Sequence, residues 1–253
     1  MKKAARQLVF YVSLLALWQV VAELRIWPPY LFPTPWSVVE ALRVGFADQG
    51  FWIAIGVSMK RMALGYGLSV LLGLALGLLI ATSKFLKETL GGLVVSLQSL
   101  PSLCWLPLAV LWFGLSEKAI LFVVVMGSLL SVTISTELGV RHVPKIYSMA
   151  GRNLGARGLQ LFLYVLLPAS LPHLVSGLKQ GWAFAWRSLV SGEMIFVSLG
   201  LGHLLMMGRD LNDMSQVVAV MVLIVTIGFL VDGLLFRTIE KSIQRKWGTA
   251  TIA

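Results

Sequence analysis

The sequence predicts an all-α membrane protein with six transmembrane helices, and its composition and apolar runs lead to that fold class. Hydrophobic residues make up 58% of the 253-residue chain, charged residues only 13%, and the mean hydropathy is +0.86. Soluble domains are nearer half apolar and a quarter charged. Several apolar runs reach the ~20 residues that a helix needs to cross a bilayer. We therefore expect a single transmembrane domain over residues 1–253.

The first span is expected at about residues 7–26 and is predicted to be retained rather than cleaved. MKKAARQLVFYVSLLALWQVVAEL begins like a signal peptide but lacks a clear small-x-small cleavage site. The segment WPPYLFPTPW that follows is rich in proline and aromatic residues, which suits an interfacial turn. Thr34 and Pro35 form an N-cap and first-turn pair. They predict a helix over about 35–47 that lies on the membrane surface.

The next two spans differ in regularity. Span two, about 61–82, carries a small residue at every fourth position, which lets another helix of the same chain or of a second copy approach closely. Span three, about 88–115, is interrupted near Gln98 and Pro101 and is expected to be broken. Irregular backbone at membrane depth survives only where protein or water covers it. Gln98, Pro101 and Trp105 are therefore candidates to line a pathway, and a plain proline kink with a packing tryptophan is the alternative.

Three further spans are predicted at about 118–137, 168–195 and 215–237, and the basic residues give their orientation. The formal net charge of +10 first suggests the inner side of a membrane rather than nucleic acid, because lysine and arginine collect on the cytoplasmic side. With the N-terminus inside, thirteen bases lie on the inner side and six on the outer, so both termini are expected to be cytoplasmic. The inner bases are Lys2, Lys3, Arg6, Lys84, Lys87, Arg141, Lys145, Arg152, Arg157, Arg237, Lys241, Arg245 and Lys246, and the outer ones are Arg25, Arg43, Lys60, Arg61, Lys118 and Arg209.

The connection between spans four and five, residues 139–167, is too organised for a simple loop. Residues 146–154 can form a short helix, and Gly155 suits a left-handed cap that ends it. Residues 157–166 can form a second helix before Pro168 ends it or begins the next span. Two short helices at an angle, with basic residues facing outward, predict a knob that a soluble partner can grip.

This segment resembles the EAA loop of the permease subunits of bacterial ABC importers, whose pattern is Glu-Ala-Ala, three residues, Gly, nine residues, Ile-x-Leu-Pro. Gly155 is followed by nine residues and then by VLLP, which ends at Pro168. The Glu-Ala-Ala positions hold Met149, Ala150 and Gly151, so the acidic residue is absent. The segments LFPTPWSVVEAL, LPSLCWLPLAVLWFGLSEKA, AWRSLVSGEM and GLGHLL are also similar to the subfamily for nitrate, aliphatic sulfonates and taurine. The resemblance covers nearly the whole chain.

The resemblance implies a type I (MetI-like) importer permease in the bacterial inner membrane, with a cytoplasmic coupling helix pair between spans four and five. Two permease copies would form the pathway, two cytoplasmic ATPase subunits would each grip one knob, and a periplasmic binding protein would deliver a small anionic or zwitterionic solute. ATP and Mg would belong to the ATPase, because this chain lacks a GxxxxGK[ST] phosphate loop, and no cofactor or catalytic residue is expected here. The expected coupling residues are Met149, Ala150, Gly151, Arg152, Gly155, Ala156, Arg157, Leu167 and Pro168.

Two ionisable residues of span five are candidate pathway or gate residues. Such a residue at bilayer depth costs about 2.5–3.5 kcal/mol on insertion scales, so it normally faces protein or water. The guanidinium of Arg187 suits oxyanions, and the residue either lines the pathway, forms an ion pair or snorkels to the interface. Glu193 lies six residues on, about 240° round the helix, so no pair with Arg187 is expected. A gate, a contact with another helix and a simple interfacial acid are the interpretations open for Glu193.

Metal-dependent and enzymatic functions have little support. His142, His173 and His203 share no metal-ligand spacing, and the single cysteine, Cys104, excludes an internal disulfide or a cysteine cluster. An intramembrane hydrolase would need a nucleophile beside a base, or a metal cluster, and the sequence has no such motif. A secondary transporter driven by an ion gradient is the other alternative, although the inverted repeats common in that class are not seen.

Overall fold

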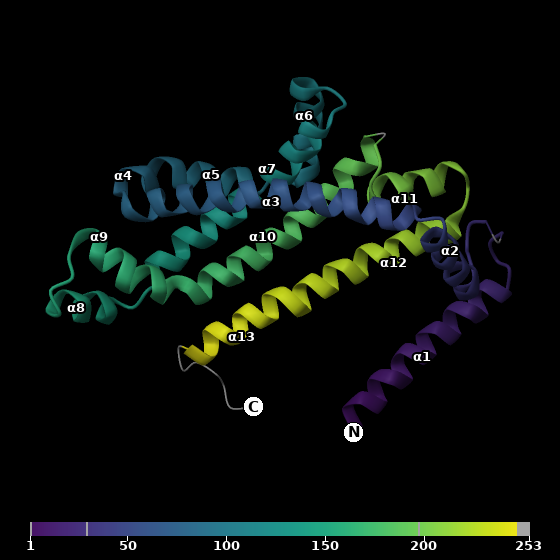
Figure 1. Ribbon diagram of the computed structural model, residues 1–253, viewed down its shortest axis with the longest axis horizontal. Helices are drawn as coiled ribbons and strands as arrows, with labels where there is room; N and C mark the ends of the chain where they lie inside the picture. The colour runs from purple at the N-terminus through teal and green to yellow at the C-terminus, as the bar shows by residue number, and fades with distance from the viewer. Residues whose placement is uncertain (1, 29, 197, 247–253) are drawn as a thin grey trace. The chain divides into compact units, whose positions relative to one another are not determined.

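The computed structural model describes residues 2–28, 30–196 and 198–246, and it confirms the all-α fold class (Figure 1). Every regular element in these ranges is helical. Five helices are long and apolar enough to cross a membrane, and a bent helix pair would make a sixth. The α-helices are α1 (Lys2–Glu23), α2 (Pro35–Ala47), α3 (Gly50–Thr82), α4 (Lys84–Leu86), α5 (Gly92–Gln98), α6 (Leu106–Phe113), α7 (Glu117–Arg141), α8 (Lys145–Asn153), α9 (Gly158–Leu161), α10 (Leu167–Ile195), α11 (Leu201–Asp210), α12 (Met214–Leu230) and α13 (Arg237–Lys246).

The chain divides into two compact units, and each is described by itself. The first unit contains Met1–Ser58 and Glu193–Thr226, and the second contains Met59–Gly192 and Ile227–Ala253. In the first unit the predicted N-cap of α2 is confirmed, because the Ser37 backbone N–H donates to Thr34 Oγ1 at 3.2 Å. The indole N–H of Trp18 donates to the carbonyl of Pro33 at 3.0 Å, which ties α1 to the turn before α2.

Helix α7 is the central helix of the second unit, with α3 and α10 packed against it (Figure 1). In its most apolar stretch 61% of the residues are buried, against 28% or less in the other candidate spans. The small residues of α3 and α10 face α7 so closely that an added Cβ would collide with it, which confirms packing within one chain. These contacts join Gly65 to Val124, Gly73 to Val132, Gly77 to Thr136, Gly177 to Ser135 and Gly181 to Val132.

Two spans are longer than the sequence suggested. Helix α3 begins at Gly50 rather than near residue 61, and α7 runs from Glu117 to Arg141 rather than from 118 to 137. The pair Lys60–Arg61 looked like the end of a span. Arg61 is instead buried, with a terminal amino group 2.9 Å from a Glu117 carboxylate oxygen, so the helix continues through it. A basic residue that has a partner inside the protein need not mark a membrane boundary.

The third predicted span is broken by a bend of 102° between Lys84–Gln98 and Ser102–Phe113. Pro101 has no backbone N–H and restricts the residue before it, so α5 ends at Gln98. A short 3₁₀ turn, Ser102–Trp105, leads into α6, whose first turn accommodates Pro107. The bend leaves irregular backbone beside α7, and a cavity of the second unit lies there.

Candidate functional site

A glycine turn separates the two short helices that join α7 to α10. Gly155 follows α8 with a φ of 89°, so the left-handed cap expected there is present. The Gly155 N–H donates to the carbonyl of Arg152 at 3.0 Å, and the Ala156 N–H donates to the carbonyl of Gly151 at 2.9 Å. These two bonds form a Schellman motif, which favours glycine at the left-handed position. The turn therefore has one defined geometry rather than that of a slack linker.

Helix α8 packs through one glycine and exposes an apolar edge. A Cβ added to buried Gly151 would lie 2.7 Å from Leu161 and 3.0 Å from Val165, so α8 and the segment after it meet there without space for a larger residue. The apolar side chains of Met149, in α8, and Leu154, just after it, are 57% and 89% exposed. Among the other predicted coupling residues, Ala156 is half-buried, and Ala150, Arg152, Gly155 and Arg157 are exposed.

The second short helix does not stop at Pro168. Helix α9 passes into a π-helical turn, Phe162–Leu166, and then directly into α10, where Leu167 and Pro168 are half-buried. The Leu167 N–H donates to the carbonyl of Phe162, five residues back. Proline cannot donate to the preceding turn, and the wider π-helical turn accommodates that missing bond. Residues 158–195 therefore form one continuous helical segment.

A cavity of about 290 Å³ in the second unit lies beside the broken span, and we call it the Arg187 cavity. It brings together Gln98, Pro101, Trp105 and Arg187, four of the five residues that the sequence suggested for a pathway. The broken span, α7 and α10 each provide part of its wall. Its lining also includes Ser102, Ser131 and Phe184.

Arg187 is exposed, and its guanidinium is only partly engaged. Its Nε–H donates to the carbonyl of Ala183 at 3.1 Å, and its Cζ lies 4.9 Å from the centre of the Phe184 ring, a cation–π contact. Within residues 2–28, 30–196 and 198–246, no carboxylate pairs with it. The ion-pair interpretation is therefore not supported, and its terminal amino groups can serve a ligand.

Ser131 is a cavity residue that the sequence did not reveal. It is only 2% exposed, and its hydroxyl has no hydrogen-bond partner in the described part of the chain. Neighbouring hydroxyls of α7 behave differently: Thr133 donates to the carbonyl of Leu129 at 2.8 Å. A serine on an apolar helix has no motif of its own, so no sequence signal distinguishes Ser131 from such back-bonded residues.

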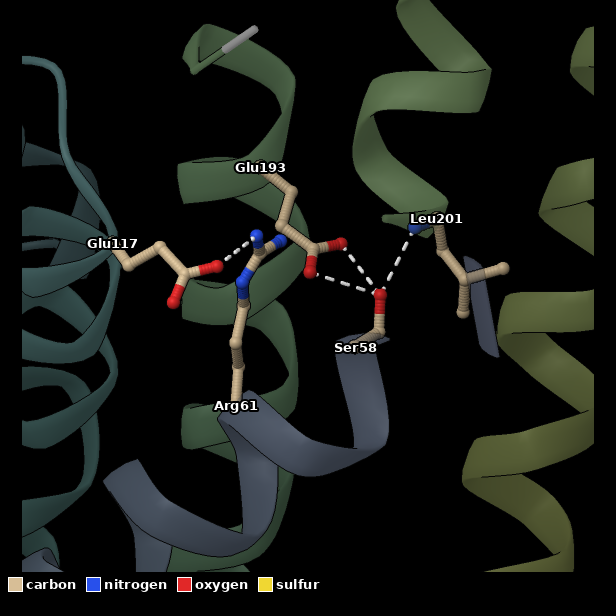
Figure 2. A network of polar contacts seen from close by, with 5 residues as sticks. All are labelled: Ser58, Arg61, Glu117, Glu193 and Leu201. Atoms are coloured by element: carbon tan, nitrogen blue, oxygen red, sulfur yellow. Dashed lines mark hydrogen bonds and ion pairs between the residues drawn. The ribbon is translucent and has the colours of Figure 1, made fainter. Parts of the chain in front are cut away.

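Glu193 does not line this cavity but belongs to a buried cluster of the first unit (Figure 2). Its carboxylate is fully buried and accepts from the Ser58 hydroxyl at 2.9 and 2.8 Å and from the Gly202 N–H at 3.1 Å. The Leu201 N–H donates to Ser58 Oγ at 2.9 Å. We call Ser58, Glu193 and these two amides the Glu193 cluster. It contradicts the interpretation of Glu193 as a simple interfacial acid.

The Glu193 cluster caps the N-terminus of α11, where unpaired amides and the helix dipole favour a negative charge. Gly200, the residue before α11, provides the space, because an added Cβ would lie 2.5 Å from the carboxyl carbon of Glu193. The carboxylate therefore ties the end of α10 to the start of α11. Whether it also acts as a gate stays a prediction.

A second cavity, of about 480 Å³, lies between α10 and residues Gly228 and Asp232 in the second unit. Lys179 Nζ lies 2.9 Å from Asp232 Oδ1, with which it forms an ion pair, and 3.9 Å from Glu240 Oε2. The ionic groups of this cavity thus largely neutralise each other, although Arg187 also reaches its edge. No cluster of histidine, cysteine and acidic residues that could hold a metal occurs in the described ranges.

Comparison with known proteins connects this geometry to a family. A family model described as the binding-protein-dependent transport system inner membrane component matches residues 70–247. The chain belongs to this family. The taurine transport system permease protein TauC of Escherichia coli is 30% identical to it over 224 residues, 87% of this chain and 82% of that protein. The nitrate import permease protein NrtB of Synechocystis is 28% identical over 239 residues, 91% of this chain and 86% of that protein.

The chain is therefore a membrane-embedded permease of the ABC importer type, as the EAA-like segment suggested. The MetNI methionine ABC transporter, solved in inward-facing conformations, matches with a TM-score of 0.65 at 20% identity over 83% of this chain and 98% of that chain. At this identity the likeness shows the fold alone, which is the MetI-like permease architecture.

Proposed function

We propose that this permease carries a small anionic or zwitterionic solute, of the nitrate, sulfonate or taurine type, from the periplasm to the cytoplasm by alternating access. A partner ATPase hydrolyses ATP with Mg²⁺, and this chain performs no catalytic step. The working assembly contains two permease copies, two ATPase subunits and a periplasmic binding protein, in a bacterial cytoplasmic membrane with both chain termini inside. The taurine and nitrate in the names of the relatives support the solute class, and the distribution of bases supports the orientation.

The observation that carries this proposal is the mechanical continuity of the coupling segment. The Schellman bonds at Gly155 fix the angle between α8 and α9, and Gly151 holds α8 against Leu161. The second helix then runs into α10 without a non-helical break. A displacement of the exposed edge of α8 by an ATPase would therefore be transmitted along this helical segment, which would act as a lever on Arg187.

The pathway residues follow from the same lever. Gln98, Pro101, Trp105 and Arg187 line the route through the second unit, and Glu193 positions α11 as part of an outer gate. The support for the first four residues is their common cavity, and the support for Glu193 is its cap on α11. Movement of α10 would change both the cavity and the cap on α11, because Arg187 and Glu193 lie on that helix.

Substitution of Gly155 tests the proposal. The permease, its ATPase and its binding protein are reconstituted in liposomes, and ATP-driven uptake is measured for whichever labelled anion the binding protein retains. Gly155→Pro should reduce uptake by about tenfold or more without reducing membrane insertion, because proline requires a φ near −65° and cannot adopt this turn. Gly155→Ala is the matched control: its Cβ meets open space, so only left-handed strain of about 1–2 kcal/mol is added and most uptake should survive.

Full uptake by the Gly155→Pro variant would count against the coupling role. Uptake by the permease alone under an ion gradient, with no ATPase present, would instead support the secondary-transporter alternative.

A further inference from the structure

The lining of the Arg187 cavity carries one formal charge, and that charge is positive. The guanidinium of Arg187 is joined by neutral polar side chains, among them Gln98, Ser102 and Ser131, and no acidic residue lines the cavity. A cation would find no compensating carboxylate there. An anion would meet a fork of donors suited to two oxygen atoms. The composition of the lining thus selects for negative charge.

Ser131 adds a donor that the fold leaves unused. Its side chain is buried, lines the cavity and has no hydrogen-bond partner among the described residues. Buried hydroxyls are normally bonded, and an exception calls for an explanation such as a ligand. An oxygen of a bound anion would accept from this hydroxyl, while Arg187 binds the other oxygens. Two independent features of the cavity therefore point to the same type of ligand.

The remaining walls are apolar, and the size of the cavity exceeds that of a bare inorganic anion. Trp105 and Phe184 contribute aromatic rings, and Met126 and Leu130 contribute aliphatic surface. The volume of about 290 Å³ equals roughly ten water molecules at ~30 Å³ each. Nitrate would fill a small part of that space and would leave the apolar walls without a partner. An anion with a short hydrocarbon body would use both parts of the site.

We infer that the Arg187 cavity is a binding site, within the permease itself, for a small organic oxyanion: a sulfonate or carboxylate with a short apolar body. The inference rests on the proposed import function and adds a place where this chain, and not only the periplasmic binding protein, holds and selects the solute. Arg187 and Ser131 bind the oxyanion, and Trp105 and Phe184 contact its apolar body.

The test uses the purified permease in complex with its ATPase, without the binding protein, and measures equilibrium binding of radiolabelled 1-butanesulfonate. Two competitors are added: nitrate, which has the charge without the apolar body, and 1-butanol, which has the body without the charge. Saturable binding of the radiolabelled ligand is expected, and each competitor should displace it about tenfold or more less effectively than unlabelled 1-butanesulfonate does. Arg187→Gln should weaken binding about 10- to 100-fold, Arg187→Lys less, and Ser131→Ala about 3- to 10-fold.

Matched controls are Arg43→Gln and Ser96→Ala, which change an exposed arginine and an exposed serine outside the lining and should leave the dissociation constant unchanged. Three results would overturn the inference: no saturable binding, equal weakening by control and cavity variants, or nitrate competing as well as 1-butanesulfonate. ATP-driven uptake in the same preparations reports on the import function separately. Intact ATP-driven uptake without binding would contradict only the proposed site. A permease that never assembles with an ATPase would contradict the proposed import function itself.

Discussion

The Glu193 cluster and the Arg187 cavity pair a charged residue of α10 with a serine of another helix, but they differ in how the polar groups are satisfied. In the first unit, the Glu193 carboxylate accepts from the Ser58 hydroxyl and the Gly202 amide, and it is fully buried. In the second unit, Arg187 and Ser131 line an open space: no described carboxylate pairs with Arg187, whose Nε–H donates to the Ala183 carbonyl, and the Ser131 hydroxyl has no hydrogen-bond partner among the described residues.

This difference distinguishes polar groups that stabilise the fold from polar groups that remain available to a ligand. A buried polar group contributes to stability only when its partner is present, and removing one partner leaves the other at a cost of about 1–3 kcal/mol. Glu193 and Ser58 are hydrogen-bonded to each other, so the cluster should stabilise the fold. Ser131 has no hydrogen-bond partner to lose among the described residues, so its hydroxyl should matter for a ligand and not for folding.

Removal of the carboxylate of Glu193 should have the largest effect on stability. Glu193→Ala deletes a charged acceptor of hydrogen bonds from the Ser58 hydroxyl and the Gly202 amide, and should lower the free energy of unfolding by about 3 kcal/mol or more. The thermal melting temperature of the purified permease complex measures this loss. Glu40→Ala, in the same unit, removes a half-exposed surface carboxylate 3.8 Å from Arg43 and should cost at most about 1 kcal/mol. Equal losses of stability in the two variants would contradict the structural role given to the Glu193 cluster.

Crowding of the cluster should have the next largest effect. The Cβ introduced by Gly200→Ala would lie 2.5 Å from the carboxyl carbon of Glu193, and overpacking of this kind costs about 1–3 kcal/mol. Gly56→Ala is the matched control, because nothing lies within 4 Å of its added Cβ. Alanine is the better helix former by about 0.5–1 kcal/mol, so this control should hold or raise the melting temperature. A Gly200→Ala variant as stable as Gly56→Ala would show that the carboxylate is not tightly held.

The features that the sequence predicted well are local. Thr34 and Pro35 begin α2, and Gly155 caps α8, because capping depends on a few neighbouring residues. The interruption around Pro101 is likewise a direct effect of a missing N–H. Arg187 was recognisable as a candidate because a guanidinium in an apolar span needs protein or water around it.

The features that the sequence did not predict depend on distant partners. Ser58 and Glu193 are separated by 135 positions, and Arg61 and Glu117 by 56 positions. Without those partners, Arg61 looked like the edge of a span, and Glu193 could not be distinguished from an interfacial acid. Ser131 was missed for a different reason: its importance comes from a hydrogen bond that is absent, and no sequence pattern records such an absence.

The central claim is that the Arg187 cavity, and not the Glu193 cluster, is where the transported solute meets this chain. One measurement tests it most directly: the melting temperatures of Ser58→Ala and Ser131→Ala permease complexes, each with and without 1-butanesulfonate. A ligand that binds only the folded state raises the melting temperature. With 1-butanesulfonate near its dissociation constant for the unmodified protein, Ser58→Ala should lose about 1–3 kcal/mol of stability yet keep its rise, whereas Ser131→Ala should melt like the unmodified protein but lose more than half of that rise. The opposite pattern, or the same behaviour in both variants, would contradict the account.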